Sequence, residues 1–247
     1  MALPTLSYSD PAVAAFVAIP LLLVAALAWG SAIAWLRSGA APRAATRGTV
    51  VVAAASIVWL AVTWMVAESG ILREWDRRPP PLMLLLGAIL ALAGATTFSP
   101  LGRRLALFVP LWAHVAVQAF RLPLELAMHG MYERGIMPGV MTYTGRNLDI
   151  VTGATAIVVA ALAANGIGGL ALVIAWNLLG LALLVNVVSV AILATPVFSY
   201  FGDDNLNVWV TYPPFVWLPA IMVLAALIGH ILIFRAVSLQ RSRSSRF

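Results

Sequence analysis

The chain has 247 residues, of which 62% are hydrophobic and only 10% are charged, and its mean hydropathy is +0.98. Soluble domains carry about 25% charged residues, so this composition excludes an ordinary soluble protein. The absence of cysteine excludes disulfides, thiolate metal sites and a cysteine nucleophile. Every basic residue is arginine, so there is no lysine for a Schiff base with retinal or pyridoxal phosphate.

Seven apolar runs follow one another along the chain. A helix needs about 20 apolar residues, within a range of roughly 17 to 25, to cross the hydrocarbon core of a bilayer. We therefore expect an all-α fold, with a single domain over 1–247 built as a bundle of about seven transmembrane helices. The runs cover residues 12–36, 50–72, 82–98, 104–130, 148–164, 167–195 and 213–235.

The positions of the arginines predict the orientation of this bundle. The net charge of +6 comes from arginines that flank the apolar runs and form no basic domain, so nucleic acid is not an expected partner. Cytoplasmic segments of membrane proteins are enriched in arginine, which predicts an outer N-terminus and a cytoplasmic C-terminus. All nine acidic residues then fall on the outer side or in the outer half of a span, which indicates chemistry that faces outward.

The fourth run and its outer end carry a stripe of polar residues. Their spacings of 4, 3, 4, 4 and 4 place them on one helix face. Ionisable groups inside a bilayer cost several kcal/mol, so they face the bundle interior or a wet cavity. Pro123 frees the carbonyl of Ala119 and predicts a kink beside the charges. The stripe consists of His114, Gln118, Arg121, Glu125, His129 and Glu133.

Two interpretations of this stripe are open. In the structural one, Arg121 and Glu125 form an ion pair one helical turn apart, which fixes the packing of the bundle. In the functional one, the outer part of the stripe binds a ligand and its inner part, His114 and Gln118, acts as a relay. The ligand-binding candidates on the stripe are Arg121, Glu125, His129 and Glu133.

The turn-rich segment 137–149 supplies further candidates. Thr144 or Gly145 is expected to cap the next helix, so that the residues after them fill its first turn. An acid in that turn suits the helix dipole, which is a structural role. In the functional alternative this segment closes over Glu125 and His129 from the outer side. Its candidate ligand-binding residues are Arg146, Asn147 and Asp149.

The residues assign no cofactor. A metal site on the outer part of the stripe and Asp149 would contain one histidine, and the sequence has no HExxH motif. A haem held between His114 and His230 would require strong tilt, because helix rise separates the two by about 9 Å in depth.

The leading hypothesis is an outward-facing site that binds or processes a small polar or anionic ligand or a lipid headgroup. A lipid-modifying enzyme would use His129 or Glu125 as a general base. A proton-coupled transporter would use the stripe as a relay. An accessory subunit would use it to dock a membrane partner, and self-association is a further option. The sequence leaves these alternatives open.

The middle third of the chain carries motifs shared with one group of proteins. They are Phe-Arg-Leu-Pro-Leu-Glu at 120–125, His129, Met-Thr-Tyr-Thr-Gly-Arg-Asn-Leu-Asp-Ile-Val-Thr-Gly at 141–153, and Trp-Asn at 176–177. In these motifs the chain resembles a group of bacterial multi-span membrane proteins without an assigned activity. The resemblance implies an inner-membrane location and no particular chemistry.

Overall fold

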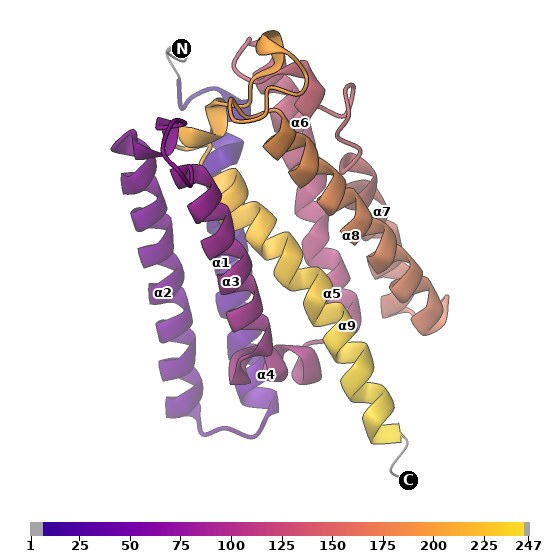
Figure 1. The fold of residues 1–247 in the computed structure, drawn as a ribbon. Helices are drawn as coiled ribbons and strands as arrows, with labels where there is room; N and C mark the ends of the chain where they lie inside the picture. Colours follow the sequence, from indigo (N-terminus) through magenta and orange to yellow (C-terminus); the bar gives the residue numbers. More distant parts are fainter. Residues whose placement is uncertain (1–6, 245–247) are drawn as a thin grey trace.

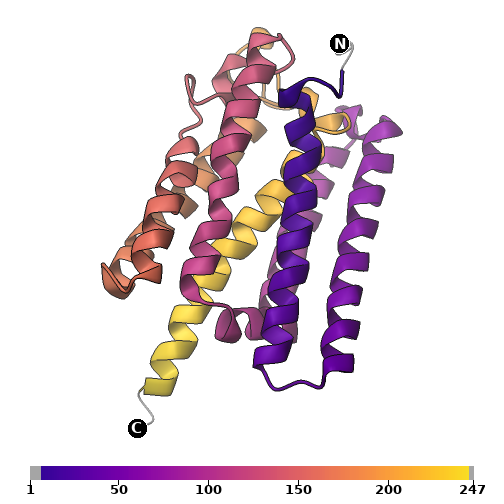
Figure 2. The same ribbon diagram turned by 180° about the vertical axis from the view of Figure 1, so that it is seen from behind.

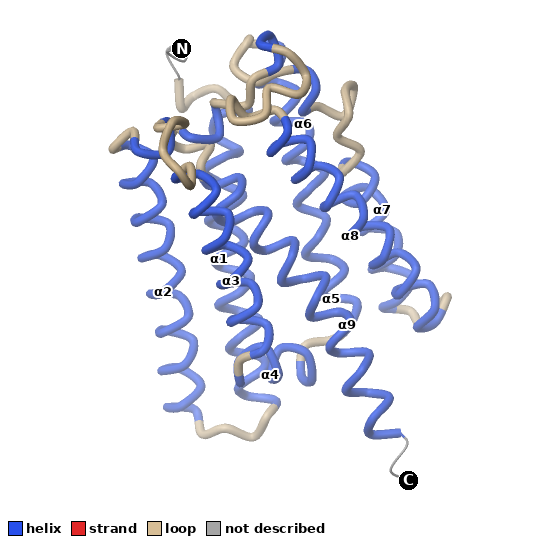
Figure 3. The backbone as a smooth tube through the Cα atoms, viewed as in Figure 1, coloured by secondary structure: helices blue, strands red, loops and turns tan. Residues whose placement is uncertain are grey.

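The computed structural model describes residues 7–244, and within this range all regular structure is helical (Figures 1 and 3). The α-helices are α1 (Pro11–Arg37), α2 (Pro42–Glu68), α3 (Pro81–Phe98), α4 (Pro100–Phe108), α5 (Leu111–Val117), α6 (Arg121–Glu133), α7 (Ile150–Ala164), α8 (Gly169–Leu193) and α9 (Leu224–Ser244). Short 3-10 turns are η1 (Ile71–Arg73), η2 (Gln118–Phe120), η3 (Gly139–Met141), η4 (Asp203–Asn205) and η5 (Trp209–Thr211), and η6 (Leu218–Val223) is a π-helix.

Several helices in the described range are long and apolar enough to cross a membrane. Five qualify alone, namely α1, α2, α3, α8 and the helix formed by η6 and α9. A sixth crossing results if α4 and the α5–α6 helix are taken together. Helix α7 has 15 residues, about 22 Å at 1.5 Å per residue, and is shorter than a hydrocarbon core of about 30 Å. The chain is therefore a multi-pass membrane protein, and the expected seventh span is not confirmed.

Helix α9 organises the bundle, because it crosses it obliquely and contacts α3, α4, α5 and α8 (Figure 1). Helices α1 and α2 pack as a hairpin, and α1 also packs on α6, as the view from behind shows (Figure 2). The turn between α7 and α8 lies at the side of the bundle and does not reach as far toward its lower end as the turn between α1 and α2 (Figures 1 and 2). The described chain begins and ends at opposite ends of the bundle.

The sequence predicted the fourth apolar run as one span with a kink beside Pro123. The structure instead divides it into α4 and the α5–α6 helix. The chain bends by 108° between α4 and α5, where Pro110 precedes the first residue of α5. The return from α3 into α4 requires glycine, because a Cβ at Gly102 would lie 2.0 Å from the Thr97 carbonyl oxygen. Arg37 of α1 then donates a hydrogen bond to the Phe108 carbonyl at 3.2 Å, which fixes the end of α4.

Two prolines change the helix type at sites of packing. The helix becomes 3-10 at η2, which contains Ala119 and ends three residues before Pro123, and this agrees with the expected distortion. Pro219 lies in the π-helix η6, and indole groups bind the backbone there. Trp59 of α2 donates to the Ala220 carbonyl at 2.9 Å, and Trp217 donates back to the Leu60 carbonyl at 3.0 Å.

Candidate functional site

A buried ion pair joins α6 to the start of α7. Arg121 Nη1 lies 2.9 Å from Asp149 Oδ1, and only 1% and 6% of the two side chains are exposed. The same nitrogen lies 3.4 Å from the Gly180 carbonyl oxygen of α8. The structural interpretation from sequence chose the wrong partner, because Arg121 pairs with Asp149 and not with Glu125. A residue outside the helix could not be found from helical spacing.

Glu125 is instead held by an asparagine from the loop before α7. The Asn147 amide nitrogen lies 2.8 Å from both carboxyl oxygens of Glu125 and 3.1 Å from the Met141 carbonyl oxygen. The Asn147 side-chain oxygen accepts from the Asp149 backbone N–H at 3.0 Å. Asn147 therefore links Glu125 to the residue that pairs with Arg121.

These four side chains, from Arg121, Glu125, Asn147 and Asp149, form what we call the buried tetrad. Each of the four residues, backbone included, is at most 4% exposed. Charges buried in this way are stable only when paired and hydrogen-bonded, because desolvation of each ion costs several kcal/mol. The sequence prediction for the start of this helix was wrong. Helix α7 begins at Ile150 with Asp149 at the N-cap position, so neither Thr144 nor Gly145 caps it, and Arg146 and Asn147 lie in the preceding loop. The tetrad thus holds this loop against α6.

Close helix packing accompanies the tetrad. A Cβ at Gly153 of α7 would lie 2.3 Å from the Leu122 backbone nitrogen, so only glycine allows α7 to approach α6 this closely. The Thr144–Gly145 turn is similarly tight, since a Cβ at Gly145 would lie 2.2 Å from the Gly139 carbonyl oxygen. Close backbone packing at the two glycines and the buried charges of the tetrad both hold the loop in place.

The outermost stripe residues lie apart from the tetrad. His129 Nε2 is 3.7 Å from Glu133 Oε1, and the His129 ring packs 4.7 Å from the ring of Tyr143. Glu133 is largely exposed, with 64% of its side chain accessible. Within residues 7–239, no hydrogen bond or ion pair connects His129 or Glu133 to the tetrad, although the loop that carries Tyr143 does cover His129.

The two inner stripe residues bind backbone groups of neighbouring helices. His114 Nε2 lies 3.3 Å from the Leu105 carbonyl oxygen, and Gln118 donates to the Ala226 carbonyl at 3.1 Å. Both side chains are buried. These contacts join neighbouring helices, which is a packing role, and the relay role of His114 and Gln118 stays a prediction.

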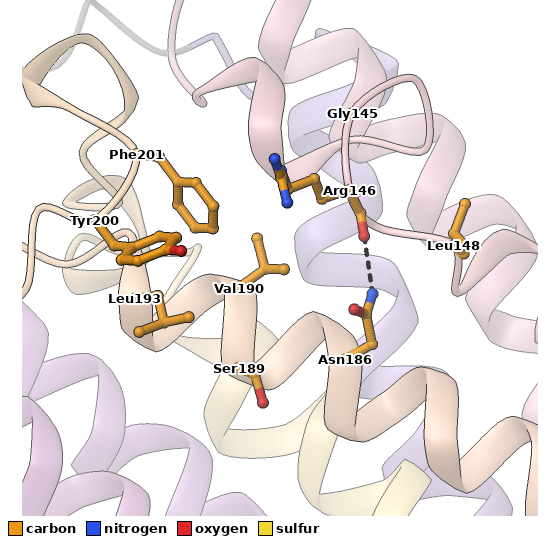
Figure 4. A pocket seen from close by; sticks show the side chains of 9 residues that line it. All are labelled: Gly145, Arg146, Leu148, Asn186, Ser189, Val190, Leu193, Tyr200 and Phe201. Carbon is orange, nitrogen blue, oxygen red and sulfur yellow. Dashed lines mark hydrogen bonds between the residues drawn. The ribbon is translucent and has the colours of Figure 1, made fainter.

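The structure places Arg146 in an open groove of about 500 Å³, whose lining includes none of the tetrad residues (Figure 4). Its guanidinium carbon lies 5.2 Å from the centre of the Phe201 ring. Asn186 of α8 donates to the Arg146 carbonyl at 2.8 Å, which fixes the backbone at this point. The groove is lined by Gly145, Arg146, Leu148, Asn186, Ser189, Val190, Leu193, Tyr200 and Phe201.

The Arg146 guanidinium has no ion-pair or hydrogen-bond partner among the described residues. The side chain is exposed. Sequence reasoning named Arg146 but missed the groove wall. A signal was present, because Asn186, Ser189, Val190 and Leu193 follow the i, i+3, i+4, i+7 pattern of one helix face.

Neither cofactor class considered from the sequence finds a matching arrangement. Among the residues that the structure describes, no three or more His, Asp or Glu side chains lie close enough to share a metal ion. His230 is 0% exposed, and a Cβ at Gly180 would lie 2.7 Å from its ring, so this site does not fit a porphyrin.

Comparisons with known proteins identify no relative. No protein-family model matches the chain, and neither a curated protein nor a solved structure matches it. The groove and the tetrad are therefore the features that bear on function.

Proposed function

We propose that this multi-pass membrane protein binds the anionic headgroup of a membrane lipid in its outer groove, with Arg146 as the anion-binding residue. The observation that carries the proposal is the unpaired, exposed guanidinium beside Phe201 in a groove of about 500 Å³. Arginine donates planar pairs of hydrogen bonds that match phosphate and carboxylate oxygens. The volume lies within the usual range for small-molecule sites, about 300 to 1,000 Å³.

The composition of the groove favours an amphiphile over a wholly polar anion. Leu148, Val190 and Leu193 supply an apolar wall for an acyl chain, and Ser189 adds a hydroxyl. Tyr200 is 70% exposed at the rim, and aromatic residues of this kind are enriched at the level of lipid headgroups. A lipid would therefore place its charge at Arg146 and its chain along α8.

The proposal includes a topology. Seven passes through an inner membrane, with α7 as a short span, would put the N-terminus and the groove on the outer side. Arg103 and Arg104 on α4 would then face the cytoplasm, as the positive-inside rule requires. The groove would meet lipids of the outer leaflet.

In this proposal the tetrad holds the loop in place and so positions Arg146. Asn147 follows Arg146 directly in the chain and is bonded to Glu125, while Asp149 is bonded to Arg121. The sequence suggested ligand binding for seven outer residues. In this proposal, only Arg146 contacts the ligand. Glu125 and Asp149 act through the loop backbone.

Lipid titration of the purified protein tests the proposal. Native mass spectrometry would compare phosphatidylglycerol with phosphatidylcholine of the same chain length, for the wild type and for Arg146→Gln. We expect the substitution to weaken phosphatidylglycerol binding about tenfold, which corresponds to about 1.4 kcal/mol, and to leave phosphatidylcholine binding unchanged. Arg77→Gln is the matched control, since Arg77 is an exposed arginine that pairs with Glu74 in the α2–α3 connection.

Equal phosphatidylglycerol affinity in wild type and Arg146→Gln would contradict the proposal, as would an equal loss in Arg77→Gln. Inorganic phosphate is the probe that separates a lipid from a free anion. We expect millimolar phosphate to compete poorly with phosphatidylglycerol, because it lacks the acyl chain that contacts α8. Full displacement by phosphate at low concentration would show that the ligand is a soluble anion.

A further inference from the structure

The protonation pattern of His230 follows from its bonds to Asn177. Asn177 donates from its amide nitrogen to the His230 carbonyl at 3.1 Å, so its side-chain oxygen is the atom that faces the imidazole. That oxygen lies 2.7 Å from His230 Nδ1 and can only accept a hydrogen bond. Nδ1 must therefore carry a proton, and in the neutral ring Nε2 is a bare acceptor.

Three buried side chains near this point have polar atoms without a partner in the protein. His230 Nε2, Gln118 Oε1, and Arg121 Nε and Nη2 all lack one. The three residues are 0%, 0% and 1% exposed. Buried polar groups are almost always hydrogen-bonded, so four such atoms on three neighbouring side chains indicate a ligand.

Contacts through glycines show that the three side chains are neighbours. Arg121 approaches the Gly180 carbonyl at 3.4 Å, and a Cβ at Gly180 would lie 3.3 Å from His230 Nε2. On the other side, a Cβ at Gly229, the residue before His230, would lie 2.1 Å from the Gln118 amide nitrogen. Helices α6, α8 and α9 and the turn η2 therefore meet around Gly180 and Gly229.

The charges select the kind of ligand. Gln118 Oε1 and neutral His230 Nε2 offer lone pairs that repel an anion, and the Arg121 guanidinium repels a cation. A water molecule has two hydrogens for the two acceptors and two lone pairs for the arginine N–H groups. Buried waters make about three hydrogen bonds to groups that otherwise have none. Water satisfies both sides of this site.

We infer that Arg121, His230 and Gln118 form a built-in water site at the junction of α6, α8 and α9. The water joins the Arg121 Nε and Nη2 groups, which Asp149 does not bind, to Nε2 of His230 on α9. The site is separate from the outer groove and does not depend on lipid binding, because Arg146 takes no part in it. It completes the polar contacts of Arg121, the most buried arginine among those whose burial the structure describes.

Nitrogen-15 NMR of histidine-labelled protein in lipid nanodiscs tests the inference. Resonances are assigned with the single variants His114→Gln and His129→Gln, which leave His230 in place. We expect His230 to be neutral with its proton on Nδ1 and to show magnetisation transfer from water. Replacement of chloride by bromide in the buffer should leave its shifts unchanged.

A proton on Nε2, or a bromide-dependent shift of His230, would overturn the inference. A density map of the full chain in nanodiscs gives a second readout that needs no substitution. The expected result is a solvent peak within hydrogen-bond distance of both His230 Nε2 and Arg121. Direct contact between those two side chains, with no peak between them, would likewise overturn it.

Discussion

Asp149, at the start of α7, lies 2.9 Å from Arg121 of α6, and the 28-residue separation between them spans the whole outer loop. Both side chains are buried, so each charge depends on the other for compensation. The pair therefore holds the end of the loop against α6, and this fixes where the loop, including Arg146, packs against α8. Loss of this ion pair should lower the free energy of unfolding and the lipid affinity of the groove.

Replacing one partner of this pair should lower the free energy of unfolding more than replacing both partners. Asp149→Leu leaves Arg121 buried without a counter-ion, and loss of one partner of a buried pair costs about 3–5 kcal/mol. The double variant Arg121→Met, Asp149→Leu replaces both charges with apolar groups and should recover a large part of that loss. Equilibrium unfolding in mixed micelles measures both. Additive losses in the double variant would show that the two residues are not energetically coupled.

Asn147 should influence lipid binding without touching the lipid. Asn147→Leu removes the bonds to Glu125 and to the Asp149 backbone, so the loop loses its anchor. We expect both the melting temperature and phosphatidylglycerol affinity to fall, whereas Arg146→Gln lowers the affinity alone. The two variants are compared in the same preparation by thermal unfolding and lipid titration. Full lipid affinity in Asn147→Leu would mean that the tetrad does not position Arg146.

The approach of α7 to α6 should tolerate no side chain at position 153. In Gly153→Ala the new Cβ would meet the Leu122 backbone nitrogen at 2.3 Å, and backbone cannot move away cheaply. We expect a loss of stability of about 1–3 kcal/mol, typical of overpacking. Gly94→Ala in α3 is the control, because a Cβ there meets nothing within 4 Å and alanine favours the helix. Similar melting temperatures for both variants would contradict this packing.

The proposed topology can be mapped directly because the native chain contains no cysteine. Single cysteines would replace exposed residues in the connections, and a membrane-impermeant maleimide would be applied from outside. Asp76→Cys and Asp203→Cys should react, whereas Ala41→Cys and Ile167→Cys should react only with a permeant reagent. Ile167 is decisive, since it lies between α7 and α8. Outside labelling at this position would mean that α7 does not cross the membrane.

Hydropathy alone predicted the helical membrane fold and most helix positions. Expected runs such as 12–36 and 167–195 correspond closely to α1 and α8. Two features could not be obtained in this way. The break near Pro110 depends on how α4 packs against α1, and a 15-residue α7 contains as many apolar residues as a short span would. Hydropathy does not report where a helix lies in the bilayer.

The polar stripe identified the right helix but not the partners of its residues. Helical spacing pairs Arg121 with Glu125. In the structure, Arg121 instead pairs with Asp149, and Glu125 accepts a hydrogen bond from Asn147 of the loop. A buried charge takes the partner that best compensates it, and that partner can be distant in sequence. Arg146 was recognisable as a candidate, but its groove exists only because α8 and the segment with Phe201 lie beside the loop.

The most direct measurement of the central claim is a density map of the protein in nanodiscs that contain phosphatidylglycerol, for the wild type and for Arg146→Gln. The account predicts headgroup density within hydrogen-bond distance of the Arg146 guanidinium and chain density along Val190 and Leu193. Both should be lost in the variant while the tetrad remains intact. An empty groove in the wild type, or unchanged density in Arg146→Gln, would contradict it.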